Sequence, residues 1–120
     1  LVDRGETREC CGGAVAPLYA EMGGSVLAFG KPHPPVYDMA RRRLAEAGGQ
    51  NISDDRILAI GDGILTDIKG AVGEGIDALF VTGGLAAQDT KTTDQPDPGL
   101  LDAFIAREGF DPTYSIGRLR

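Results

Sequence analysis

One stretch, residues 56–71, constrains the fold more than any other part of this chain. An apolar run over residues 57–60 is too short for a helix and ends at Gly61, which predicts a buried strand. The tripeptide Gly61-Asp62-Gly63 then predicts a sharp turn at the end of that strand. In open α/β sheets the chemistry gathers where parallel strands end, so we expect a functional site at this turn.

Two carboxylates follow the predicted strand. Asp62 lies on the turn, and Asp67 opens a predicted helix for which Thr66 is the expected N-cap. Hard cations such as Mg²⁺ bind oxygen ligands and need few protein carboxylates, since waters and substrate phosphate complete the shell. On spacing alone this metal site is no better supported than a structural role, in which Asp62 ends a strand and Asp67 complements a helix dipole.

Alternating apolar and amphipathic segments predict an α/β fold. Strands are predicted at residues 25–29, 57–60 and 76–82, and helices at about 12–22, 34–47, 67–74 and 100–105. This alternation implies right-handed crossovers and a parallel sheet with helices on both faces. Lys31, Asp62 and Gly83 follow the three strands, so we expect them at one rim of the sheet. Residues 86–98 predict a long polar loop, and residues 111–120 an irregular or strand-like tail.

Two motifs occur in a particular order. Gly30-Lys31-Pro32-His33 precedes a helix, and Gly61-Asp62-Gly63 with Asp67 follows a strand. Together they resemble the third and fourth motifs of the haloacid dehalogenase (HAD) superfamily of phosphatases, most closely the subclass with a large α/β cap between its second and third motifs. The resemblance covers about residues 10–86. It implies a three-layer α/β/α, Rossmann-like core, with residues 13–120 as its C-terminal half and residues 1–12 as the end of the cap and the crossing to the core.

The resemblance also implies roles for individual residues. Lys31 would steady the phosphoryl group and the nucleophile, and Asp62 and Asp67 would hold Mg²⁺, for hydrolysis of a small phosphorylated metabolite. His33 is a weaker candidate for substrate contact, because a histidine among prolines is readily explained by a hydrogen bond within a loop. Two glycines before a helix can expose N–H groups to a phosphate, although a flexible crossing between cap and core explains Gly12 and Gly13 more simply.

The nucleophile of the resembled family has no counterpart in this sequence. That family forms an aspartyl-phosphate on an Asp-x-Asp motif, and no Asp-x-Asp occurs in the 120 residues. The chain opens at Leu1 rather than at a methionine, which favours a fragment or a processed product. We therefore expect the isolated chain to be inactive. Two alternatives stay open: a non-catalytic α/β module that binds Mg²⁺ or a phosphorylated ligand, and a site that another polypeptide completes in trans.

Charge and composition restrict the partners. The net charge of −6 argues against nucleic acid and against an anionic membrane surface, because both reward a basic face. No apolar run approaches the ~20 residues that span a bilayer, and no signal peptide is visible, so a cytoplasmic location is expected. Cys10 and Cys11 are adjacent and the only cysteines, which predicts reduced thiols rather than a disulfide or a zinc site. Whether the chain forms a homo-oligomer stays open.

Overall fold

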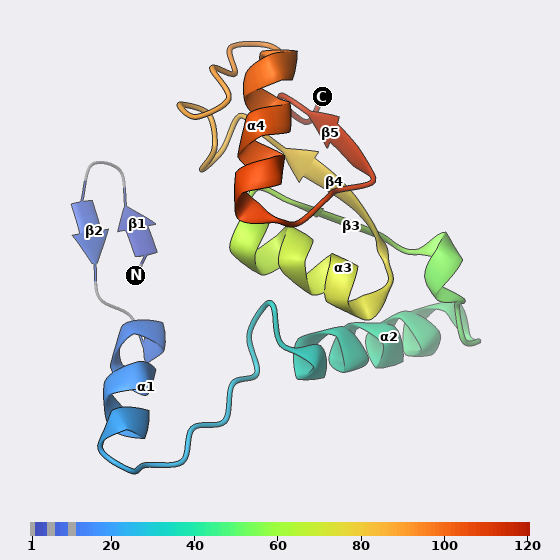
Figure 1. Ribbon diagram of the computed structural model, residues 1–120. Helices are drawn as coiled ribbons and strands as arrows, with labels where there is room; N and C mark the ends of the chain where they lie inside the picture. The colour runs from blue at the N-terminus through green and yellow to red at the C-terminus, as the bar shows by residue number, and fades with distance from the viewer. Residues whose placement is uncertain (1, 5–6, 10–11) are drawn as a thin grey trace.

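The computed structural model describes residues 2–4, 7–9 and 12–120 (Figure 1). Cys10 and Cys11, predicted to be reduced thiols, lie outside the described residues. The elements in chain order are β1 (Val2–Arg4), β2 (Thr7–Glu9), α1 (Gly12–Glu21), α2 (Pro34–Gly48), a 3₁₀ turn (Asp54–Arg56), β3 (Leu58–Gly61), a π-helical turn (Ile64–Ile68), α3 (Lys69–Glu74), β4 (Asp77–Val81), α4 (Pro98–Glu108) and β5 (Tyr114–Ile116).

Strands β3, β4 and β5 form a parallel sheet with β4 in the centre. Ile60 pairs with Leu79, and Val81 pairs with Ile116, so all three strands end at the same rim. Helix α3 connects β3 to β4 and helix α4 connects β4 to β5, as the alternating pattern predicted. The α/β class with a parallel sheet is therefore confirmed. Strands β1 and β2 form a separate antiparallel hairpin, which Figure 1 shows apart from this sheet.

The core lies on one face of the sheet. Ala78 and Phe80 of β4 are buried there against the segment that contains α3 and against α4. The rings of Phe80 and Phe104 stack with their centroids 6.0 Å apart and an interplanar angle of 10°. The remaining buried members of the cluster are Ile64, Ile68, Ala71, Ala86 and Leu101. On the opposite face Leu58, Ile60 and Tyr114 are exposed, so burial of this sheet is one-sided.

Two strand predictions need correction. Residues 25–29 have no regular structure, and Leu27 and Phe29 are 81% and 63% exposed. A strand needs a partner for its N–H and C=O groups, and among the described residues none of β3, β4 and β5 pairs with this segment. Strand β3 exists as predicted but is not buried, because it is the edge strand and alternate side chains, Leu58 and Ile60, point to the open face.

The helix boundaries follow the predicted signals. Helix α2 begins at Pro34, where a missing N–H costs no hydrogen bond, and ends before Gly49, which has a left-handed φ of 69°. Helix α3 ends in the same way at Gly75. The tail predicted as irregular or strand-like contains β5, which adds to the sheet beside β4. None of the helices in the described part of the chain has the length and hydropathy needed to cross a lipid bilayer.

Arg41 joins α2 to the rest of the domain. Its guanidinium donates to both carboxylate oxygens of Asp54, at 3.0 and 3.2 Å, and to Glu74 at the end of α3, at 2.7 Å. The Arg41 side chain is 27% exposed, so these ion pairs are only partly screened by solvent. Helix α2, and with it the Lys31 loop that precedes it, is thereby fixed against α3.

Candidate active site

Lys31 and Asp67 form an ion pair at the rim of the sheet. Lys31 lies in a turn that the His33 N–H closes by donating to the Gly30 carbonyl at 3.0 Å. Its ammonium is 2.5 Å from Oδ1 of Asp67. The hydrogen bond to Asp67 raises the pKa of Lys31 above its ordinary value, and the nearby charge of Asp62 acts in the same direction. Lys31 is therefore held as a cation between two carboxylates.

The turn after β3 sets the position of Asp67. The Gly63 carbonyl accepts the N–H groups of Thr66, Asp67 and Ile68, at 3.2, 2.8 and 3.1 Å, which winds residues 64–68 into a π-helical turn. The helical segment therefore starts earlier than predicted, and Thr66 is not its N-cap. Gly63 occupies that position instead, because its carbonyl collects the first helical bonds.

Asp67 folds back over the end of β3. Its Oδ2 accepts the Gly63 N–H at 3.0 Å, while Oδ1 faces Lys31. The carboxylate packs directly on Gly61, where any Cβ would overlap it. The side chain of Asp67 is only 12% exposed, whereas that of Lys31 is 53% exposed. Gly61 is thus required for the packing of the Asp67 carboxylate, and it is also part of the turn after β3.

Asp62 is held by the loop that follows β4. Its Oδ2 accepts the N–H of Leu85 at 3.2 Å, and the carboxylate packs on Gly84, where a Cβ would overlap it. Within the described part of the chain, Oδ1 of Asp62 has no hydrogen-bond partner. One oxygen of Asp62 is therefore anchored and the other stays available to a ligand.

Tyr37 lies behind the Lys31–Asp67 pair. Its hydroxyl lies against Gly70 of α3, at a position where a Cβ on Gly70 would collide with it. Burial raises the pKa of Tyr37, and the negative charge of Asp67 adds to this effect while Lys31 opposes it. Tyr37 thus stays a neutral phenol and fills the space between α2 and α3 next to the ion pair.

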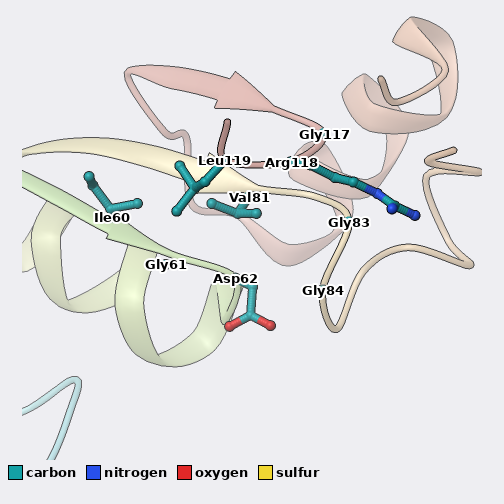
Figure 2. A pocket seen from close by; sticks show the side chains of 9 residues that line it. All are labelled: Ile60, Gly61, Asp62, Val81, Gly83, Gly84, Gly117, Arg118 and Leu119. Atoms are coloured by element: carbon teal, nitrogen blue, oxygen red, sulfur yellow. The ribbon is translucent and has the colours of Figure 1, made fainter. Parts of the chain in front are cut away.

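An open cavity of about 610 Å³ lies beside Asp62 (Figure 2). Ile60 and Val81 line its apolar part, and Gly83, Gly84 and Arg118 lie along its rim. Figure 2 shows Asp62 at the end of β3, with its carboxylate projecting away from Ile60 and Val81, and the Arg118 side chain extending away from Asp62. Asp62 is therefore one of the residues that line this cavity.

The donor set of this rim fits Mg²⁺ better than a metal that needs many protein ligands. In residues 2–4, 7–9 and 12–120, no three His, Cys, Asp or Glu side chains come together as a metal site. Mg²⁺ needs only one or two carboxylates and takes its remaining ligands from water and phosphate. Asp62, with one unpartnered oxygen, would be the direct ligand, and Asp67 the nearest second carboxylate.

The structure brings together three of the residues singled out in the sequence: Lys31, Asp62 and Asp67. Lys31 reaches the rim on a loop rather than at the end of a strand. His33 is exposed at the start of α2 and makes no side-chain capping bond. Gly12 and Gly13 begin α1, which Figure 1 shows well away from the ends of β3 and β4. Substrate contact by these three residues therefore stays a prediction.

Two groups that contribute to this site, the Leu85 N–H and Tyr37, were not identified from the sequence. The Leu85 N–H is a main-chain group, so no residue type signals it. Tyr37 was given no role from the sequence, because nothing in its neighbourhood along the chain marks it. For Leu85 the Gly83-Gly84 pair after β4 was the available signal, since Gly84 is required by the approach of Asp62.

Fold and site together define a class: α/β proteins with a parallel sheet that carries a lysine and two carboxylates at its strand ends. A family model described as HAD-hydrolase-like matches residues 28–106. This match spans more than half of the chain and includes Lys31, Asp62 and Asp67. The chain therefore belongs to the HAD-like hydrolases.

Solved structures agree with this assignment. A haloacid dehalogenase-like hydrolase from Brucella suis 1330 is 37% identical, with a TM-score of 0.67 over 92% of this chain and 37% of its own. A possible sugar phosphatase of the HAD superfamily from Cytophaga hutchinsonii is 25% identical, with a TM-score of 0.61 over 88% and 33%. A p-nitrophenyl phosphatase from Archaeoglobus fulgidus, 21% identical with a TM-score of 0.58 over 88% and 35%, shares the fold.

The chain thus spans about a third of the length of these proteins. No curated protein matches it by sequence.

Proposed function

We propose that this chain carries the phosphate-binding and metal-binding part of a Mg²⁺-dependent phosphatase that acts on a small phosphorylated metabolite. The observation that carries the proposal is the Lys31–Asp67 ion pair, 2.5 Å long, beside the carboxylate of Asp62, whose Oδ1 has no hydrogen-bond partner among the described residues, in a HAD-like fold. The lysine cation at this rim can bind the negatively charged oxygens of a phosphate ester, and the carboxylates can bind the divalent ion that accompanies it.

Lys31 has the capacity to bind phosphate without leaving Asp67. An ammonium group has three N–H donors, and one of them is used on Oδ1 of Asp67. The other two are available to phosphoryl oxygens, and the exposure of Lys31 leaves room for a ligand. Lys31 would stabilise the negative charge that builds up on the transferring phosphoryl group. Asp67 would orient Lys31 and keep it protonated.

Asp62 supplies the oxygen for the metal. When bound, Mg²⁺ would neutralise charge on the phosphoryl oxygens. The Leu85 N–H and the close packing on Gly84 fix the direction of the Asp62 carboxylate before any ligand arrives. The nucleophile must come from a group outside these 120 residues, because the chain contains no Asp-x-Asp.

The absence of an Asp-x-Asp motif favours a second candidate function, a binding module that holds Mg²⁺ or a phosphorylated ligand without turning it over. A related version has another polypeptide complete the site. Strand β3 is the outermost strand of the sheet in the described part of the chain, so its outer main-chain N–H and C=O groups could pair with a strand of a partner, and the exposed Leu58 and Ile60 offer apolar surface on the adjacent face. Turnover of a phosphate ester by the 120-residue chain alone would contradict both versions.

The test is calorimetric titration of the 120-residue chain with Mg²⁺, with and without inorganic phosphate as the probe. We expect Asp62→Asn to weaken Mg²⁺ binding at least tenfold and Lys31→Met to weaken phosphate binding more than Mg²⁺ binding. Asp102→Asn, on the exposed side of α4, is the matched control and should change neither. Mg²⁺ affinity equal in wild type and Asp62→Asn would refute the metal assignment.

A further inference from the structure

Three threonines near the rim are joined through their hydroxyl groups. Thr82 follows β4, and Thr90 and Thr92 lie in the loop before α4. The Thr92 hydroxyl donates to Oγ1 of Thr82 at 2.8 Å, and the hydroxyls of Thr90 and Thr92 are 2.7 Å apart. Thr82 and Thr90 are fully buried, and they are the buried polar residues among those whose burial the structure describes.

This chain of hydroxyls is anchored at both ends to the main chain. At one end the Thr82 hydroxyl donates to the Ile116 carbonyl of β5, at 3.4 Å. At the other end the Thr90 N–H donates to the Ala86 carbonyl at 3.0 Å, and the Thr90 hydroxyl donates to the same oxygen at 2.8 Å. Thr92 donates to Thr82 and Thr82 to Ile116, so the Thr90 proton serves both the Ala86 carbonyl and the Thr92 oxygen.

The linked threonines bracket the segment that contacts Asp62. Thr82 comes immediately before it and Ala86 immediately after it, so residues 83–85 are the only ones between the two anchored points. This segment contains Gly84, on which the Asp62 carboxylate packs, and Leu85, whose N–H donates to Asp62 Oδ2. Gly83 N–H donates to the Gly117 carbonyl at 2.8 Å, which ties the start of the segment to the residue after β5.

The hydrogen bonds among the hydroxyls of Thr82, Thr90 and Thr92 stabilise this loop in addition to the packing of its side chains. The Leu85 side chain is 65% exposed, so packing of its own side chain does little to hold its backbone in place. The Ala87 N–H donates to the Gly84 carbonyl at 3.1 Å and the Thr82 N–H donates to the Ile116 carbonyl at 2.9 Å, and the threonine hydroxyls add to these main-chain bonds at the two ends of the segment, Thr82 and Ala86. A segment of three residues held at both ends has few conformations left.

We propose that Thr82, Thr90 and Thr92 are positioning residues that hold the Leu85 N–H against Asp62 and so fix the carboxylate direction for metal binding. The metal part of this inference rests on the proposed function of Asp62. The threonines would touch neither metal nor substrate, and they act through the 83–85 segment alone.

Thr92→Val tests the inference in the 120-residue chain, because valine keeps the shape of threonine and removes the hydroxyl. Thr92→Ser retains the hydroxyl, and Thr93→Val changes a neighbouring exposed threonine. Hydrogen exchange of the Leu85 amide, followed by NMR, is the decisive readout. We expect exchange at least threefold faster in Thr92→Val and in Asp62→Ala, which removes the acceptor of the Leu85 N–H, with Thr92→Ser and Thr93→Val close to wild type.

Mg²⁺ titration of the same variants is the second readout, and we expect Thr92→Val to weaken binding at least threefold, with rescue by Thr92→Ser. Unchanged Leu85 exchange in folded Thr92→Val would overturn the inference. If Thr92→Val does not fold, Thr92→Ala removes the same hydroxyl without placing a second methyl group beside the hydroxyls of Thr82 and Thr90. If wild type does not bind Mg²⁺, the proposed function fails, whereas Leu85 exchange still decides whether the threonines hold the segment.

Discussion

The Lys31 ammonium and the Asp67 carboxylate are 2.5 Å apart although 36 positions separate them in the chain. Two features of the folded structure bring these side chains together. The π-helical turn places Asp67 over Gly61, and Arg41 fixes α2, with the Lys31 loop before it, against α3. Because Asp67 is almost buried and Lys31 is half exposed, the pair combines a fixed anion with an accessible cation.

The first prediction concerns pH. The pKa of Lys31 is raised in the folded protein by the hydrogen bond to Asp67, so the pair stabilises the fold fully below the ordinary lysine pKa of 10.5. That contribution is lost as pH rises through the raised pKa. Lys31→Met should therefore lower the free energy of unfolding at pH 7 by less than about 1 kcal/mol, since Lys31 is half exposed.

Denaturant unfolding at pH 7, 9 and above 10.5 measures this difference, which should shrink at the highest pH. Lys91→Met removes another exposed lysine and is the control for the loss of a lysine side chain. A Lys31→Met difference that grew with pH would contradict the stabilising role of the protonated Lys31.

A second prediction concerns Gly61. Alanine at this position places a methyl group where the Asp67 carboxylate lies, so Gly61→Ala should lower the free energy of unfolding by about 1–3 kcal/mol. The displaced Asp67 should also release Lys31 and weaken phosphate binding. Gly73→Ala is the matched control, because its added methyl group meets no atom within 4 Å and alanine favours the helix. Equal stability of the two variants would disprove the packing argument.

Arg41 gives a third prediction. Lysine retains the charge but cannot donate to both oxygens of Asp54 and to Glu74 at once, so Arg41→Lys should cost about 1 kcal/mol of unfolding free energy. Among the described residues Arg43 pairs with the exposed Glu46 alone, and Arg43→Lys should stay within about 0.5 kcal/mol of wild type. Urea denaturation of the two variants decides the matter, and a larger loss in Arg43→Lys would be the contrary result.

A fourth prediction concerns the core beneath the rim. Phe104 stacks on Phe80 and is 6% exposed, so Phe104→Ala should lower the free energy of unfolding by about 3–5 kcal/mol. Leu119→Ala, at a 60% exposed position, should lose far less. Thermal unfolding followed by circular dichroism separates the two. A small loss in Phe104→Ala would mean that α4 contributes little to the stability of the sheet.

Local patterns in the sequence predicted much of this structure. The short apolar run before Gly61 indicated β3, the run before Thr82 indicated β4, and the glycines after α2 and α3 marked their ends. The joint position of Lys31, Asp62 and Asp67 followed from the family resemblance, whereas the strand at residues 25–29 that strand alternation used to place Lys31 does not form. These features depend on residues close together in the sequence or on a general rule of parallel sheets.

Features that depend on distant partners were not predictable in this way. Residues 25–29 have the composition of a strand, but a strand forms only where a second one pairs with it, and composition does not report that. The edge position of β3 was not predictable for the same reason, because a run of apolar residues does not show how many neighbouring strands will pair with it. The Leu85 N–H and the bond from Thr92 to Thr82 are likewise settled by tertiary contacts.

Strand β3 is an outer strand of the sheet in the described part of the chain, so a further strand could pair with its outer side. Neighbouring strands in a sheet lie about 4.8 Å apart, and parallel strands end at the same rim. A further strand laid parallel to β3 would therefore end beside Asp62. Under the proposed function, a group one or two residues beyond the end of such a strand would lie close enough to Asp62 to act on the same phosphate ester, so the outer side of β3 is where a strand that carries the nucleophile would pair.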